Sequence, residues 1–248
     1  MSPMTDGVEI IAHRGYSARA PENTLAALEA AFAAGADAVE LDLHTAACGT
    51  PVLLHDAMLS RTTNGVGPVR RRTFTQLLNL DAGAWFSADF AGEKIPSLEQ
   101  ALAACSGQAV RVYAEVKGFR ELEDLDRMVS LTRNAAMLDR VVFIAMNWTI
   151  LERMRGQEPT LTIGYIVDEA GEAEEAVQRA TGDGHALVDY RASLVLDDPS
   201  LAQRALEVGV DVAVWTVDDP GEASRLAEMG VRRFTTNRVS DLLAWKAA

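Results

Sequence analysis

Short apolar runs rich in β-branched residues recur along the whole chain, and segments with a helical pattern separate them. The eight runs cover residues 8–12, 38–43, 110–115, 141–146, 162–167, 186–190, 211–215 and 232–236. Strands that alternate with helices form parallel sheets, because each crossover helix returns the chain to the same end of the sheet. Eight such units in 248 residues predict an α/β fold, a (β/α)8 TIM barrel. A doubly wound open sheet is the structural alternative.

Several helix boundaries can be read directly from capping residues. Ser97 and Gln100 have the spacing of a capping box, which predicts a helix over 97–105. A second helix is expected over 24–34, ending at Gly35. Gly209 and Gly230 are expected to end helices just before strands.

One interval, residues 56–96, is too long for an ordinary connection between a strand and a helix. We expect a small insertion after the second strand, over the barrel mouth, within a single domain that spans 1–248. Trp85, Phe86 and Phe90 lie in this segment; they either form its own small core, the commoner case, or line the mouth.

The formal net charge of −13 argues against nucleic acid or an anionic membrane surface as a partner, because the field of the protein repels both. Two cysteines are too few for a disulfide framework and indicate a reducing compartment. Residues 1–6 lack the basic and apolar regions of a secretory signal, and no run approaches about 18 apolar residues. We therefore expect a soluble, cytoplasmic protein without stable membrane association. The oligomeric state cannot be predicted.

Carboxylates gather at the ends of the second and third predicted barrel strands. Strand periodicity places Glu40 and Asp42 on one face, and Glu115 and Lys117 share a face of the next strand. Three carboxylate ligands without a nearby cysteine favour one hard divalent cation, Mg²⁺ or Ca²⁺. The alternative is that these acids form structural salt bridges with Lys117 or another base.

Two of the four histidines follow strand ends, where they can exchange protons with a substrate. His13 follows the first strand and His55 follows residues 51–54. A facing pair can protonate a leaving alkoxide and deprotonate a nucleophile. His44 and His185 are expected at the surface or behind the site.

Basic and aromatic residues near the same strand ends supply the remaining contacts that a phosphodiester needs. Arg14 can bond two phosphoryl oxygens at once, and Lys117 adds a point charge. Trp215, at the end of the seventh strand, either walls the pocket for the alcohol or packs in the core. These groups together predict a small-molecule phosphodiester as substrate.

The chain resembles the glycerophosphodiester phosphodiesterase family in an ordered set of motifs over nearly its whole length. They are His13-Arg14-Gly15, Pro21-Glu22-Asn23-Thr24, Glu40-Leu41-Asp42-Leu43, Pro51-Val52-Leu53-Leu54-His55-Asp56, Arg61-Thr62-Thr63-Asn64-Gly65, Ile95-Pro96-Ser97-Leu98, Glu115-Val116-Lys117 and Val214-Trp215-Thr216. The turn at 45–49 and the segment 235–239 depart from the family pattern. The second departure lies at the mouth of the eighth strand, where it bears on substrate preference.

The resemblance implies a barrel hydrolase that splits glycerophosphodiesters into sn-glycerol 3-phosphate and an alcohol with a divalent cation. It assigns the metal to Glu40, Asp42 and Glu115, acid and base work to His13 and His55, and phosphate contacts to Arg14 and Lys117. The family's inserted segment matches 56–96. These roles agree with those that charge and spacing indicate.

Other functions remain open at this stage. Within the same class, the substrate is alternatively a lysophospholipid or a sugar phosphodiester. A Schiff-base aldolase that uses Lys117 is a different enzyme class, and a non-catalytic phosphate-binding barrel is a third possibility. Loss of activity on chelation argues against the aldolase, and binding without turnover is the signature of the third.

Overall fold

Eight parallel strands close into a barrel in the computed structural model, which describes residues 5–108 and 110–248. Strand β1 pairs with β9 on one side and with β2 on the other, and these pairings close the sheet. The open-sheet alternative is therefore wrong. The barrel strands are β1 (Glu9–Ala12), β2 (Ala38–Thr45), β4 (Arg111–Val116), β5 (Val141–Ala145), β6 (Thr162–Val167), β7 (Ala186–Arg191), β8 (Asp211–Trp215) and β9 (Arg233–Thr236). All eight predicted runs are confirmed, with ends shifted by at most two residues.

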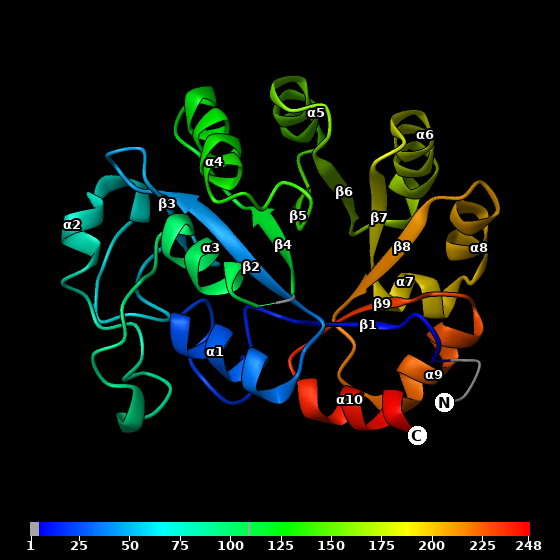
Figure 1. Ribbon diagram of the computed structural model, residues 1–248, viewed down its shortest axis with the longest axis horizontal. Helices are drawn as coiled ribbons and strands as arrows, with labels where there is room; N and C mark the ends of the chain where they lie inside the picture. The colour runs from blue at the N-terminus through cyan, green and yellow to red at the C-terminus, as the bar shows by residue number, and fades with distance from the viewer. Residues whose placement is uncertain (1–4, 109) are drawn as a thin grey trace.

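The helices form a ring around the strands, as Figure 1 shows. They are α1 (Leu25–Ala34), α3 (Leu98–Ser106), α4 (Leu122–Asn134), α5 (Trp148–Gln157), α6 (Ala173–Asp183), α7 (Ala192–Asp197), α8 (Ser200–Glu207), α9 (Pro220–Glu228) and α10 (Val239–Ala247), with a short 3-10 turn η3 (Ala170–Glu172) before α6. The largest apolar core lies between the outward faces of the strands and this ring. A smaller apolar cluster, which includes Ile11, Val142 and Leu187, fills the barrel interior. Above this cluster, at the carboxyl ends of β1, β2 and β4, the residues that face inward are polar or charged.

The predicted helix caps are present. Ser97 and Gln100 form a reciprocal capping box at the start of α3. Gly35 ends α1 with φ of 86°, a left-handed conformation that suits glycine. Gly209 and Gly230 also have positive φ, just before β8 and β9. The sequence did not predict α7, which follows β7 directly and precedes α8.

The segment 56–96 follows a short strand, β3 (Pro51–Leu53), that pairs antiparallel with β2 outside the barrel. It contains only short elements, η1 (Val69–Arg71), α2 (Phe74–Leu77) and η2 (Ala88–Phe90). Figure 1 shows it in cyan to green beside β3 and α3. Its apolar side chains form a separate small core with residues of the β2–β3 turn. Trp85, Phe86 and Phe90 stack edge to face on one another, which agrees with a local packing role.

The opposite end of the barrel, where the strands begin, is closed by a paired polar cluster. Glu9 accepts hydrogen bonds from the Tyr113 hydroxyl at 2.7 Å and from the Arg233 guanidinium at 2.6 Å. Arg111 lies 3.3 Å from the same carboxylate. The ends of this barrel therefore differ: the charges at the amino end are paired with one another.

The structure bears on the expectations about cysteines and membrane segments. Both cysteines are free, with Cys48 exposed and Cys105 buried. No helix of the described ranges is long and apolar enough to cross a membrane. Residues 1–4, on which part of the expectation about a secretory signal depends, lie outside the described residues.

Candidate active site

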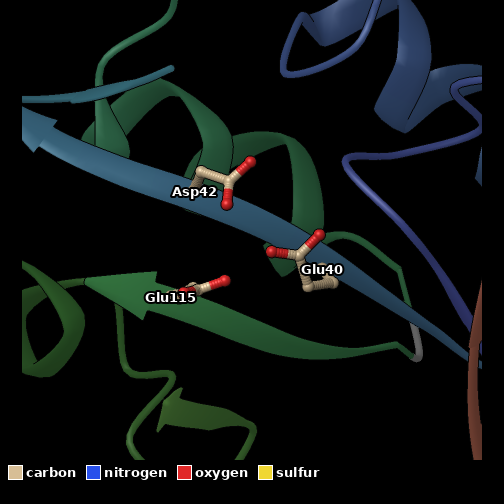
Figure 2. Close-up of side chains that lie close together, drawn as sticks. All are labelled: Glu40, Asp42 and Glu115. Atoms are coloured by element: carbon tan, nitrogen blue, oxygen red, sulfur yellow. The ribbon is translucent and has the colours of Figure 1, made fainter. Parts of the chain in front are cut away.

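Three carboxylates converge at the carboxyl ends of β2 and β4. The register of these strands places Asp42 directly beside Glu115, and Glu40 lies two residues earlier on the same face as Asp42. One oxygen from each of the three carboxylates lies within 4.8 Å of the others. Figure 2 shows the three side chains pointing toward one another across the two strands. The sequence prediction that these acids share one place is confirmed by their geometry.

Burial makes this cluster electrostatically costly without further positive charge. Glu40 and Asp42 are 3% and 1% exposed, and Glu40 Oε1 and Asp42 Oδ1 are buried without a hydrogen-bond partner. Burial and the neighbouring charges of Asp42 and Glu115 raise the pKa of Glu40 well above its usual value. Burial likewise raises the pKa of Glu115. Buried carboxylates of this kind are stabilised by a cation between them.

Lys117 and Arg14 neutralise part of this charge. Lys117 Nζ lies 2.7 Å from Glu115 and 3.6 Å from Asp42. Although burial opposes it, the Glu115 and Asp42 charges raise the pKa of Lys117. The amine is therefore protonated at neutral pH, which disfavours the aldolase alternative because a Schiff base needs a free amine.

The turn after β1 holds Arg14 in place over the acid cluster. Arg14 has φ of 56°, a left-handed conformation, and its backbone N–H donates to Glu40 Oε2 at 2.8 Å. Its side chain donates to Glu22 at 2.9 Å and lies 3.2 Å from Asp42. The next residue, Gly15, also has positive φ, and a Cβ there would meet the Ala27 backbone at 2.6 Å. This close approach explains why the motif needs glycine.

His13 lies beside the cluster and is fixed by the loop after β9. Its Nδ1 is 2.8 Å from Asn237 Oδ1, and its Nε2 is 3.9 Å from Glu40. Burial, helped by the charge of Arg14, lowers the pKa of His13 to about 4, although Asp42 opposes this. The ring is therefore neutral at pH 7, and one of its nitrogens can accept a proton. Asn237 belongs to the segment that departs from the family pattern, and Asp218 holds it through two hydrogen bonds.

His55 follows β3 and is positioned by polar residues on both sides. Its Nδ1 is 2.7 Å from Asp56 Oδ1, and its carbonyl oxygen is 3.1 Å from His44 Nε2. Arg61 donates to both oxygens of Asp56 and to both oxygens of Glu22. One guanidinium from the inserted segment therefore connects the partner of His55 with the partner of Arg14.

A pocket of about 190 Å³ opens between these groups. The predicted site residues that line it are His13, Arg14, Glu40, His55, Glu115, Lys117 and Trp215. Asp42 lies just behind it, held by Asn23 at 2.8 Å. Among the expected bystanders, His44 is buried behind His55, whereas His185 is exposed and lines a separate hollow with Arg111 and Arg233. The structure therefore brings together all eight residues to which the sequence assigned roles.

Sequence reasoning missed three residues of this site: Arg61, Asn237 and Asp189. Arg61 lies in a motif that the resemblance includes, so its position was available as a signal. Asp189 is an inward-facing residue of β7 that lines the pocket. A single acid in an otherwise apolar run is the only sequence signal for it.

This fold and pocket define a (β/α)8-barrel enzyme with its site at the carboxyl ends of the strands. Residues 13–241 match the Glycerophosphoryl diester phosphodiesterase family. The chain belongs to that family, whose members are phosphoric diester hydrolases.

Individual relatives match over nearly their whole length. A glycerophosphodiester phosphodiesterase of Caldanaerobacter subterraneus subsp. tengcongensis is 30% identical, with 94% of this chain and 96% of the relative covered. Among solved structures, a phosphodiesterase of Oleispira antarctica in complex with the product sn-glycerol-3-phosphate superposes with a TM-score of 0.90. It is 28% identical, and 97% of each chain is covered. A glycerophosphodiester phosphodiesterase of Agrobacterium tumefaciens is 26% identical, with 97% of this chain and 100% of that chain covered and a TM-score of 0.81.

Proposed function

We propose that this protein hydrolyses glycerophosphodiesters to sn-glycerol 3-phosphate and an alcohol, with one divalent cation and two histidines. The observation that carries the proposal is the acid cluster, with His13 and His55 lining the same pocket. The barrel acts as one domain over 1–248, with 56–96 as its inserted segment. The cytoplasmic location stays a prediction.

The residues present fit a hard cation. Glu40 Oε1 and Asp42 Oδ1 are buried and have no hydrogen-bond partner, so each has a free lone pair. All three side chains offer oxygen, the ligand atom that Mg²⁺ and Ca²⁺ prefer. Glu40, Asp42 and Glu115 would hold the ion. When bound, it supplies Lewis-acid stabilisation of charge on a phosphoryl oxygen.

Arg14 and Lys117 bind the phosphoryl group. Both side chains carry positive charge at the pocket wall, and both are already held by carboxylates, so they lose little side-chain freedom on binding. Two fixed cations stabilise the negative charge that the phosphoryl oxygens carry during the reaction.

His13 and His55 exchange protons with the nucleophile and the leaving alcohol. His13 is neutral at neutral pH, which suits the role of general base. His55 then protonates the leaving oxygen, and Asp56 orients its ring through Nδ1. Trp215 borders the space for the organic part of the substrate.

The test measures release of sn-glycerol 3-phosphate from glycerophosphocholine and glycerophosphoethanolamine, with and without chelator. Wild type is compared with Glu115→Gln, which keeps the side-chain volume, and with Glu99→Gln, an exposed acid of α3. We expect chelator-sensitive release in wild type and Glu99→Gln, and a loss of at least about 10³-fold in Glu115→Gln. Release of sn-glycerol 3-phosphate that survives chelation would refute the proposed requirement for a divalent cation. Absence of release from both substrates would refute the proposed substrate class.

A further inference from the structure

Asp189 stands apart from the other acids of the pocket. It lies on β7, four places from β2 in the closed sheet, so it faces the acid cluster from the opposite side of the barrel. The residue is 3% exposed and lines the pocket. Its Oδ1 is buried without a hydrogen-bond partner.

The surroundings of Asp189 give no structural reason for a carboxyl group. Asp42 is bonded to Asn23 and lies 3.2 Å from Arg14. Asp189 instead lies directly beside Ile166 of β6 in the sheet register and shares the pocket wall with Ile166 and Trp215. Burying a polar group without a partner costs about 1–3 kcal/mol. An apolar residue at this position would therefore stabilise the barrel, and a ligand explains why the acid is present instead.

The pocket has two unlike halves. Charged side chains from β1, β2, β4 and the segment after β3 form one half, where the phosphoryl group binds. The other half comes from β5 to β9, and its lining is apolar except for Asp189, Thr216 and Thr235. Trp215 is fixed there because its Nε1 donates to the backbone oxygen of Asp189 at 3.3 Å. A ligand with its phosphate in the first half extends its organic part toward Asp189.

We propose that the Asp189 carboxyl binds a hydroxyl group of the glycerol part of the diester and so selects glycerol over an unsubstituted alkyl chain. This inference rests on the proposed function, because it assumes a glycerophosphodiester in the pocket. It makes Asp189 a specificity-determining residue.

A hydroxyl fits this place better than the ammonium of a head group. Burial, together with the charge of Glu115, raises the pKa of Asp189 to about 8, so the carboxyl is largely neutral at pH 7. A neutral carboxyl offers one donor and acceptor oxygens, which matches a hydroxyl that both donates and accepts. An ammonium only donates and would require the ionised form among apolar neighbours.

The test uses two diesters that share the ethanolamine leaving group. One is glycerophosphoethanolamine and the other is propyl phosphoethanolamine, which lacks both glycerol hydroxyls. We expect Asp189→Leu to lower kcat/KM for the first diester at least about 30-fold, or about 2 kcal/mol, and for the second less than about threefold. Asp189→Asn, which can still bond a hydroxyl, should retain most of the preference. Ile166→Val alters the same wall without removing a polar group and should affect both diesters alike.

Calorimetry gives a readout that does not depend on turnover. Asp189→Leu should weaken binding of sn-glycerol 3-phosphate at least about tenfold and leave propyl phosphate unchanged. The melting temperature of Asp189→Leu should equal or exceed that of wild type. If it is lower, because leucine does not fit the site, Asp189→Ala is used in its place.

The outcomes separate the two proposals. Equal losses on both diesters, or none on either, would overturn the role of Asp189 while the hydrolase function stands. If wild type cleaves neither diester, the proposed function fails; if it cleaves only the glycerol diester, the proposed function stands but the two kcat/KM values cannot be compared. In both cases the calorimetric preference alone tests the role of Asp189, and absence of that preference overturns it.

Discussion

Arg61 offers a sharp test of how the inserted segment serves the site. Its Nε and Nη2 donate to Asp56 at 2.7 and 3.1 Å, and its Nη1 and Nη2 donate to Glu22 at 2.9 and 2.7 Å. Asp56 orients His55, and Glu22 accepts from Arg14. Arg61→Ala removes all four hydrogen bonds at once and leaves both carboxylates without their shared partner.

The expected effect on catalysis is much larger than the effect on stability. The Arg61 side chain is 42% exposed, so loss of its ion pairs costs no more than about 1 kcal/mol, or about 3 °C in melting temperature. A shift of about 1 Å in a catalytic group can cost about 10²-fold in rate. Because Arg61 supports both His55, the proposed proton-transfer group, and Arg14, the proposed phosphate-binding group, we expect kcat to fall about 100-fold in Arg61→Ala.

The assay follows sn-glycerol 3-phosphate release from glycerophosphoethanolamine and separates kcat from KM. Arg61→Lys keeps the positive charge but lacks the planar guanidinium that bonds both carboxylates, so its kcat should lie between those of wild type and Arg61→Ala. Arg71→Ala, which removes an exposed arginine of η1, is the matched control and should equal wild type. A kcat for Arg61→Ala within threefold of wild type would refute the positioning argument, as would a loss of activity that merely follows unfolding.

Three other perturbations have defined outcomes. In the absence of divalent cations, Glu40→Gln should raise the melting temperature, because it relieves the repulsion of the buried Glu40 carboxylate by Asp42 and Glu115. It should also abolish the further increase in melting temperature that we expect Mg²⁺ or Ca²⁺ to give wild type. Asp124→Asn should lower the free energy of unfolding by about 2 kcal/mol at pH 7 in denaturant titrations. Burial acts to raise the pKa of Asp124, but hydrogen bonds from Arg120 hold it below its usual value. The ionised carboxylate therefore stabilises wild type above about pH 4, and the unfolding free energies of the two proteins should converge as the pH falls below that value. Gly15→Ala should destabilise the turn by more than about 1 kcal/mol and lower kcat, since its Cβ would clash with Ala27; unchanged thermal and kinetic values would contradict the close packing.

Local patterns were sufficient to predict the barrel and its acid cluster. The alternation of apolar runs with helical segments identifies eight strands, because each strand must be apolar where it faces the helix ring. Glu40 and Asp42 share a face by strand periodicity alone, and Glu115 joins them because β4 is the neighbour of β2. The sequence therefore predicted this part of the site through regular secondary structure.

Contacts made by loops could not be predicted in the same way. Arg61 reaches Glu22, 39 positions away, only because the inserted segment folds back onto the turn after β1. Asn237 contacts His13 because closure of the barrel brings β9 next to β1. The face on which Asp189 points depends on the register of β7, which one acid in an apolar run does not reveal.

The two ends of the barrel show how the fold separates stability from function. At the amino end, Glu9 is bonded to Tyr113 and Arg233, so the partly buried charge there has its partners within the protein. At the carboxyl end, Glu40, Asp42 and Asp189 each retain a buried oxygen without a hydrogen-bond partner. The first cluster is paired within the protein, whereas we propose that the free oxygens of the second are stabilised further when a cation or a substrate hydroxyl binds. Glu40 and Asp189 therefore cost the barrel stability at the places where we propose that ligands bind, and replacing either with a neutral or apolar residue should raise stability as activity falls.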